Sequence, residues 1–136
     1  MANFSDKMEN NIINHFFMNQ TSVAKTQHFL ALFTGSDGIE ANLPTEEVTG
    51  GAYARATVTF TTATAGTSEN AATVTWAEAT AAWGAITHLA IVDSVDGTEY
   101  GTSVNVMMWG ALTATKTVST GDTFKIAAGD LDITVA

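Results

Sequence analysis

The sequence predicts an all-β domain, a β-sandwich of jelly-roll type, with one amphipathic α-helix at its N-terminus. Residues 1–20 carry the apolar period of a helix, whereas residues 28–136 carry short strand patterns separated by turns. About seven such strands at near-regular spacing are typical of a sandwich or jelly roll. No composition shift or linker divides the 136 residues, so we expect a single domain.

The helix is predicted by four apolar residues at every fourth position: Phe4, Met8, Ile12 and Phe16. This spacing places them on one face of a helix, and Ser5 or Asn3 is the expected N-cap. Two interpretations of the face remain open. It packs on the domain's own sheet, or it docks on a partner subunit or a larger shell.

The strand patterns begin with residues 28–34, which are apolar on both faces as in a central strand. Residues 35–51 are rich in polar and turn residues and predict a long loop. Residues 52–60 alternate, with Tyr53 and Arg55 sharing one face. Further strands are expected at 71–76, 85–92, 104–112, 123–127 and 131–135.

The charge and composition exclude several classes of function. The net charge is −9 and the five Lys and Arg residues are scattered, so we expect no binding to nucleic acid or to an anionic membrane surface. The absence of cysteine excludes disulfides and thiolate chemistry. Only 14% of the residues are charged, against about 25% in ordinary soluble domains, which suits a protein covered in an assembly.

No catalytic, metal or cofactor motif is present, so we expect no enzyme activity, no metal and no cofactor. His15, His28 and His88 lie far apart in the sequence and lack the spacing of a zinc site. Acidic residues cluster in turns near 93–99 and 122–132 without the order of a calcium loop, which favours solvated turn acids over a bound cation. Ser and Thr are abundant, but no nucleophile elbow occurs.

Five large aromatic residues leave two interpretations open: Tyr53, Trp76, Trp83, Tyr100 and Trp109. Such side chains usually serve as core or interface anchors, which we favour here. A platform on which sugars stack is the alternative.

Several blocks of the sequence resemble a family of small tailed-bacteriophage proteins that are usually labelled tail fibre proteins. The blocks include Leu30-Ala-Leu-Phe-Thr34, Gly50-Gly-Ala-Tyr-Ala-Arg55, Trp83-Gly-Ala-Ile-Thr-His88 and Thr120-Gly-Asp-Thr-Phe124, after an opening at residues 3–17. They follow the family's order over nearly the whole chain, although residues 99–108 depart from the shorter connection expected there. The resemblance carries no catalytic residue over to this sequence.

The resemblance implies a structural protein on the surface of a phage virion, assembled in the cytoplasm of the bacterial host. Because no repeat or heptad of a fibre shaft is present, we expect a capsid decoration (cement) protein. A tail-fibre or receptor-binding tip that binds a host surface glycan is the alternative, and a stand-alone carbohydrate-binding module is a third class. The expected partners are further copies in a homotrimer and the major capsid protein or tail proteins. The expected interface residues are Phe4, Met8, Ile12, Phe16, Trp83 and Trp109.

Overall fold

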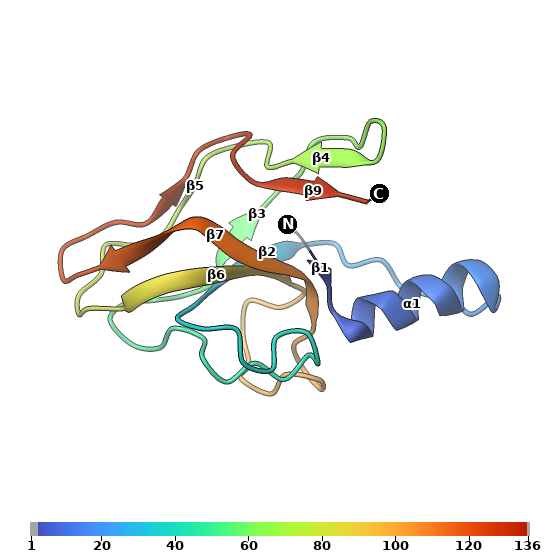
Figure 1. Ribbon diagram of the computed structural model, residues 1–136, viewed down its shortest axis with the longest axis horizontal. Helices are drawn as coiled ribbons and strands as arrows, with labels where there is room; N and C mark the ends of the chain where they lie inside the picture. Colours follow the sequence, from blue (N-terminus) through green and yellow to red (C-terminus); the bar gives the residue numbers. More distant parts are fainter. Residues whose placement is uncertain (1–2, 136) are drawn as a thin grey trace.

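The computed structural model describes residues 3–135 and confirms an all-β fold with one N-terminal helix (Figure 1). The elements in chain order are β1 (Asn3–Phe4), α1 (Asp6–Phe17), β2 (His28–Phe33), β3 (Ala56–Val58), β4 (Thr67–Glu69), β5 (Val74–Thr75), β6 (Gly84–Val92), β7 (Val106–Val118), β8 (Lys125–Ile126) and β9 (Asp132–Thr134).

Five strands form the main antiparallel sheet in the order β1-β7-β6-β2-β3, and β4-β9 and β5-β8 form two short pairs. β2 is the strand expected at 28–34, and five of its six residues are buried. Its side chains point to opposite faces of the sheet in turn, so both faces must be covered. This confirms the prediction of a central strand.

The first face of the main sheet packs against the two short strand pairs, which lie above it in Figure 1. Leu30 and Leu32 of β2 share this core with Trp76 and Phe124, whose rings meet edge to face at 5.2 Å. The buried Asn70 stabilises the layer formed by the two short strand pairs, because its amide nitrogen donates to the carbonyls of Ala72 and Ala127. The layer is therefore held by aromatic packing and by a fully used amide.

Loops cover the second face of the main sheet, below it in Figure 1. Phe29, Ala31 and Phe33 of β2 pack there with Ile39 of the long loop and Val104 of the loop before β7. Both of these loop residues are fully buried. The long loop predicted at 35–51 thus forms a wall of the core.

The structure adds β4, which the sequence did not predict, and shortens several of the predicted strands. Three further differences are the most informative. Phe4 lies in β1, paired with Met108 of β7, and the helix begins only at Asp6. The strand expected at 52–60 is reduced to Ala56–Val58, because only this part pairs with β2. β7 extends to Val118, six residues beyond the expected end, since its Thr-rich second half still pairs with β6.

The second half of β7 is irregular and lies at the edge of the main sheet. Ile86 pairs with Lys116 and His88 with Ala111, so Thr87 alone lies opposite residues 112–115. This excess on one strand is a β-bulge. β1 pairs with β7 only at Met108 and Trp109, and among residues 3–135 no other strand pairs with the outer edge of β7.

Candidate functional site

Helix α1 is attached to the domain at its first turn only. The side chain of Ser5 is the N-cap: it accepts a hydrogen bond from Met8 N at 3.2 Å, and its hydroxyl donates to the carbonyl of Val106. The backbone N–H of Asp6 donates to the carbonyl of Glu40 at 2.9 Å. Beyond this anchor no residue of α1 is buried, and the helix projects from the sandwich (Figure 1).

The free end of α1 carries uncovered apolar side chains. Ile13, Phe16, Phe17 and Met18 are 51%, 73%, 79% and 62% exposed. Met8 and Ile12 are half-buried, so packing on the domain's own sheet, the first interpretation of the helix face, applies to them and not to the free end of the helix. Exposed apolar side chains gathered in this way are typical of interaction sites.

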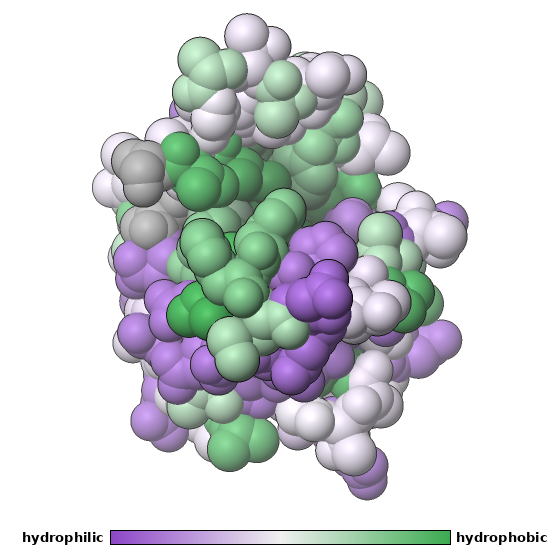
Figure 2. Space-filling model, turned by 90° about the vertical axis from the view of Figure 1, so that its right-hand side faces the viewer, coloured by the Kyte–Doolittle hydropathy of each residue, from purple (hydrophilic) through white to green (hydrophobic). Residues whose placement is uncertain are grey.

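An apolar groove of about 430 Å³ runs between α1, the main sheet and the C-terminal strand. It is lined by Phe4, Met8, Ile12, Phe16, His28, Phe60, Ile91, Met107, Met108, Ile133 and Val135. Figure 2 looks onto this end of the molecule and shows apolar surface over the helix end and in the hollow above it. The four helix-pattern residues that we predicted as an interface thus lie together along one groove.

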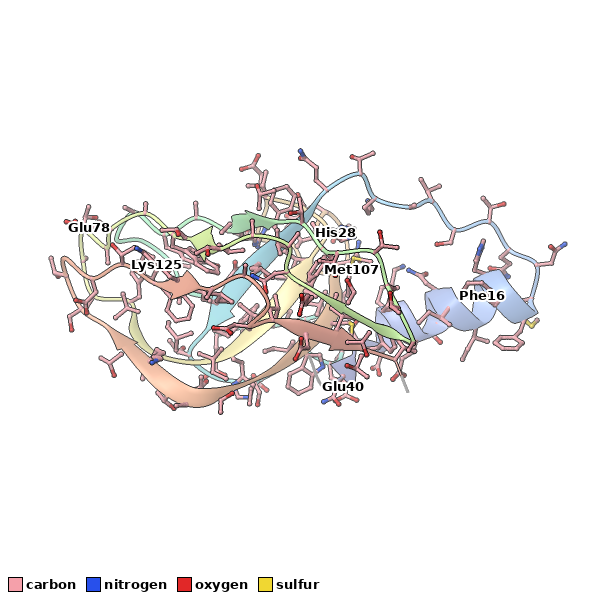
Figure 3. All side chains as sticks on the ribbon, turned by 90° about the horizontal axis from the view of Figure 1, so that it is seen from above. Phe16, His28, Glu40, Glu78, Met107 and Lys125 are labelled. Atoms are coloured by element: carbon pink, nitrogen blue, oxygen red, sulfur yellow. The ribbon has the colours of Figure 1, made fainter. Side chains whose placement is uncertain are left out.

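A second groove of about 520 Å³, called the polar groove below, lies between α1 and the segment that returns from the helix to β2. It shares Met8, His28 and Met107 with the apolar groove. Figure 3 shows residues 18–27 running alongside α1, with His28 and Met107 near the inner end of the space between them. Lys7, His15, Lys25 and His28 all line this groove. The sequence analysis did not find it, because the return segment has no periodic pattern that places it beside the helix.

Trp83 and Trp109, the other two predicted interface residues, lie away from the helix face. Trp83 is 5% exposed and belongs to the core, where its indole N–H donates to the carbonyl of Gly51 at 2.9 Å. A Cβ on Gly51 would lie 2.9 Å from the indole nitrogen, so only glycine permits this approach. Trp109 is half-buried against the loop-covered core and near the ring of His88. The two tryptophans therefore do not extend the apolar surface of α1, and Trp83 offers no face for stacking.

A buried ionic cluster joins the two loops that cover the second face, and the sequence analysis missed it. Arg55 donates to both carboxylate oxygens of Glu47, at 2.8 and 2.7 Å, and to the carbonyls of Ser94 and Gly97. The hydroxyls of Tyr53 and Tyr100 also donate to Glu47, at 3.0 and 2.6 Å. Burial, reinforced by the charge of Glu47, raises the pKa of both tyrosines.

The remaining ionisable residues do not gather into a catalytic or metal centre. His15, His28 and His88 lie on α1, β2 and β6 respectively. Within residues 3–135, no three His, Asp or Glu side chains are grouped so that they could hold a metal ion. In the same part of the chain, no helix has the length and apolar character needed to cross a membrane.

Comparison with known families adds to this geometry. The sequence model of the family described as "Podophage GP4 fiber I protein gp80" matches residues 3–134. The chain belongs to this family. It is therefore a structural protein of a phage virion, of the fibre type, and the resemblance seen in the sequence is confirmed. A search among curated proteins finds no matching relative.

Proposed function

We propose that the protein is a non-enzymatic fibre subunit on the phage tail that assembles with further copies of itself through α1. One observation carries this proposal: the helix ends in uncovered apolar side chains and borders an apolar groove. The family description names a fibre protein, which suits this proposal at least as well as the capsid decoration expected from the sequence.

The size of the surface supports a protein partner. A phenylalanine buries about 150–250 Å² when it is fully covered, so Phe16 and Phe17 alone expose about 300 Å² at their stated fractions. Such an area already equals the largest apolar patch of many monomers, about 300–600 Å². Together with Ile13, Met18 and the groove, α1 supplies a large part of the roughly 800 Å² per partner that a stable interface buries.

Two complementary shapes on one chain support a second copy as that partner. The end of α1 is a convex apolar ridge, and the groove beside it is a concave apolar surface. A ridge of one copy seated in the groove of the next is a head-to-tail contact, which forms a ring when the rotation closes. A homotrimer, the state expected from the sequence, is the smallest such ring.

The assembly is tested by replacing one residue of the groove-facing helix stripe. Ile12→Asp places a charge in the apolar groove, whereas Asn10→Asp adds the same charge at an exposed position that does not line it. Sedimentation of the purified proteins should show a trimer for the wild type and for Asn10→Asp, and a folded monomer for Ile12→Asp. A wild-type monomer at high concentration, or an Ile12→Asp trimer, would contradict self-association through α1.

The location on the virion is tested separately by counting copies on purified particles against the major capsid protein. A fibre subunit should be present at a small fraction of the capsid number and should label at the tail with gold-tagged antibody. A ratio approaching one to one, with labelling over the whole shell, would establish a decoration protein and overturn the fibre proposal.

A further inference from the structure

Lysine and histidine side chains gather in the polar groove beside α1, although the protein as a whole is strongly acidic. The chain has 14 Asp and Glu residues but only five Lys and Arg and three His. Lys7, Lys25, His15 and His28 all line this one groove, whereas Asp93 is the one acidic residue that lines it among residues 3–135. Half of the basic and histidine side chains thus converge on one site, which favours an anionic ligand there.

The hydrogen bonds and the ion pair within the groove leave Lys7 and His28 free to contact a ligand. Lys25 pairs with Asp93 at 3.3 Å, and the other oxygen of Asp93 accepts from the backbone N–H of Asn105 at 2.7 Å. The charge of Asp93 is therefore already engaged by its neighbours. In the part of the chain that the structure describes, Lys7 and the ring of His28 have neither an ion pair nor a hydrogen bond.

The helix arranges three of the lining residues in a row. Lys7, Asn11 and His15 are spaced by four, so they follow one another along one side of α1. The N–H at Nδ1 of His15 donates to the carbonyl of Gln20 at 3.1 Å, which ties the helix end to the return segment and leaves Nε2 for a ligand. The row presents a charge, an amide and an imidazole in order along the groove.

The remaining side chains that line the polar groove suit a ligand with hydroxyl groups and one apolar face. Thr21 and Ser22 line the groove from the return segment with hydroxyls that can donate and accept. Met8, Val106 and Met107 contribute apolar surface to the same groove. Its volume of about 520 Å³ lies within the range of about 300–1,000 Å³ typical of small-ligand sites.

We propose that this groove binds a saccharide that carries a carboxylate. Lys7 and His28 contact the carboxylate, Asn11, Thr21 and Ser22 bond the hydroxyls, and Met8 and Met107 pack against the ring. A single carboxylate matches the small excess of positive charge in the groove. The net charge of −9 opposes nucleic acids and other polyanions, because long-range repulsion acts on every charge that they carry.

The test uses the whole chain and compares glucuronate with glucose, which differs at the group that should bind Lys7. Titrations at low ionic strength, followed by backbone amide shifts in NMR spectra, should show glucuronate bound at the groove and glucose bound much more weakly. Lys7→Gln should weaken glucuronate binding about tenfold, the effect of one lost charge-assisted hydrogen bond. Lys125→Gln is the matched control, because Lys125 is an exposed lysine at the far end of the molecule (Figure 3).

Three results would overturn the proposal: no glucuronate binding, equal affinity for glucose and glucuronate, or equal loss in Lys7→Gln and Lys125→Gln. A fourth would be inorganic phosphate bound as tightly as glucuronate at the same amides, since that would define a general anion site and not a saccharide site. Sedimentation of the same samples separates this test from self-association, because the substituted residue, Lys7, lines only the polar groove, whereas Met8, His28 and Met107 line both grooves.

Discussion

The loops on the second face of the main sheet and the region around α1 differ in how far their polar and apolar groups are paired or covered. In the loop cluster of Arg55, Glu47, Tyr53 and Tyr100, hydrogen bonds join every member, and Arg55 also donates to two backbone carbonyls. At α1, large apolar side chains are uncovered, and Lys7 and the ring of His28 in the adjoining groove have no hydrogen bond or ion pair within residues 3–135. The loop cluster is therefore satisfied within the chain, whereas the region around α1 keeps groups that a partner or ligand can contact.

The difference separates stability from recognition. Buried charges are costly unless each one is paired, so the loop cluster must be complete for the domain to fold well. Uncovered apolar surface adds nothing to the stability of the isolated chain, and its gain comes only when a partner covers it. Substitutions in the two regions should therefore affect different measurements.

The largest effect is expected from removing the buried cation. Arg55→Met should lower the free energy of unfolding by about 3–5 kcal/mol, because it leaves Glu47 in a site where the Arg55 side chain is 5% exposed. Lys25→Met removes the ion pair between Lys25 and Asp93, whose lysine is 51% exposed, and should cost less than about 1 kcal/mol. Urea unfolding measures both, and similar losses for the two variants would contradict the comparison.

A smaller effect is expected at alkaline pH. The folded-state pKa of Tyr53 and Tyr100 is raised, so the unfolded chain releases protons first as the pH rises. The stability that this difference contributes is fully present below about pH 10, the ordinary pKa of tyrosine, and is lost as the pH rises further. The urea concentration at the midpoint of unfolding should therefore be lower at alkaline pH than at neutral pH.

The control for this pH effect is the double variant Tyr53→Phe and Tyr100→Phe, which removes both tyrosines of the chain. Its stability should be lower at neutral pH but should fall less between neutral and alkaline pH. An equal fall in the variant and in the wild type would assign the alkaline loss to other groups and remove the loop cluster from the explanation.

The smallest effect on stability is expected at the open region. Ile12→Asp should change the free energy of unfolding of the isolated monomer by no more than about 0.5 kcal/mol, because no residue of α1 is buried. Thermal unfolding at low protein concentration measures this change. A loss as large as that of Arg55→Met would show that α1 belongs to the folding core and would remove the contrast between the regions.

Sequence patterns predicted those parts of the fold that depend on local periodicity. The helix was found because Met8, Ile12 and Phe16 repeat at the helical period, and Ser5 is a good N-cap. β2 was found because an apolar run without polar alternation must be covered on both faces. Phe4 was misplaced because it continues the helical spacing by chance, whereas its backbone pairs with β7.

The site depends on contacts between distant segments, which no local pattern reveals. Arg55 meets Glu47 because a long loop folds back over the sheet. The alternating pattern around Arg55 predicted only which face of a strand it shares with Tyr53, and not this partner. The polar groove needs Lys7 and Lys25 on opposite walls, brought together by a return segment without regular structure. Trp83 was assigned to an interface by residue type, and its burial follows from the close approach of Gly51.

The bulge in β7 affects whether the exposed edge of the main sheet can pair with the sheet of another copy. An exposed edge strand joins readily to the edge strand of another sheet, so copies of a chain held close together are prone to pair there. Residues 112–115 bow out opposite Thr87, and Lys116 follows them on the same exposed strand, so the outer edge is neither straight nor free of charge. A straight strand-to-strand contact along this edge is therefore disfavoured, and the proposed self-association through α1 does not need it.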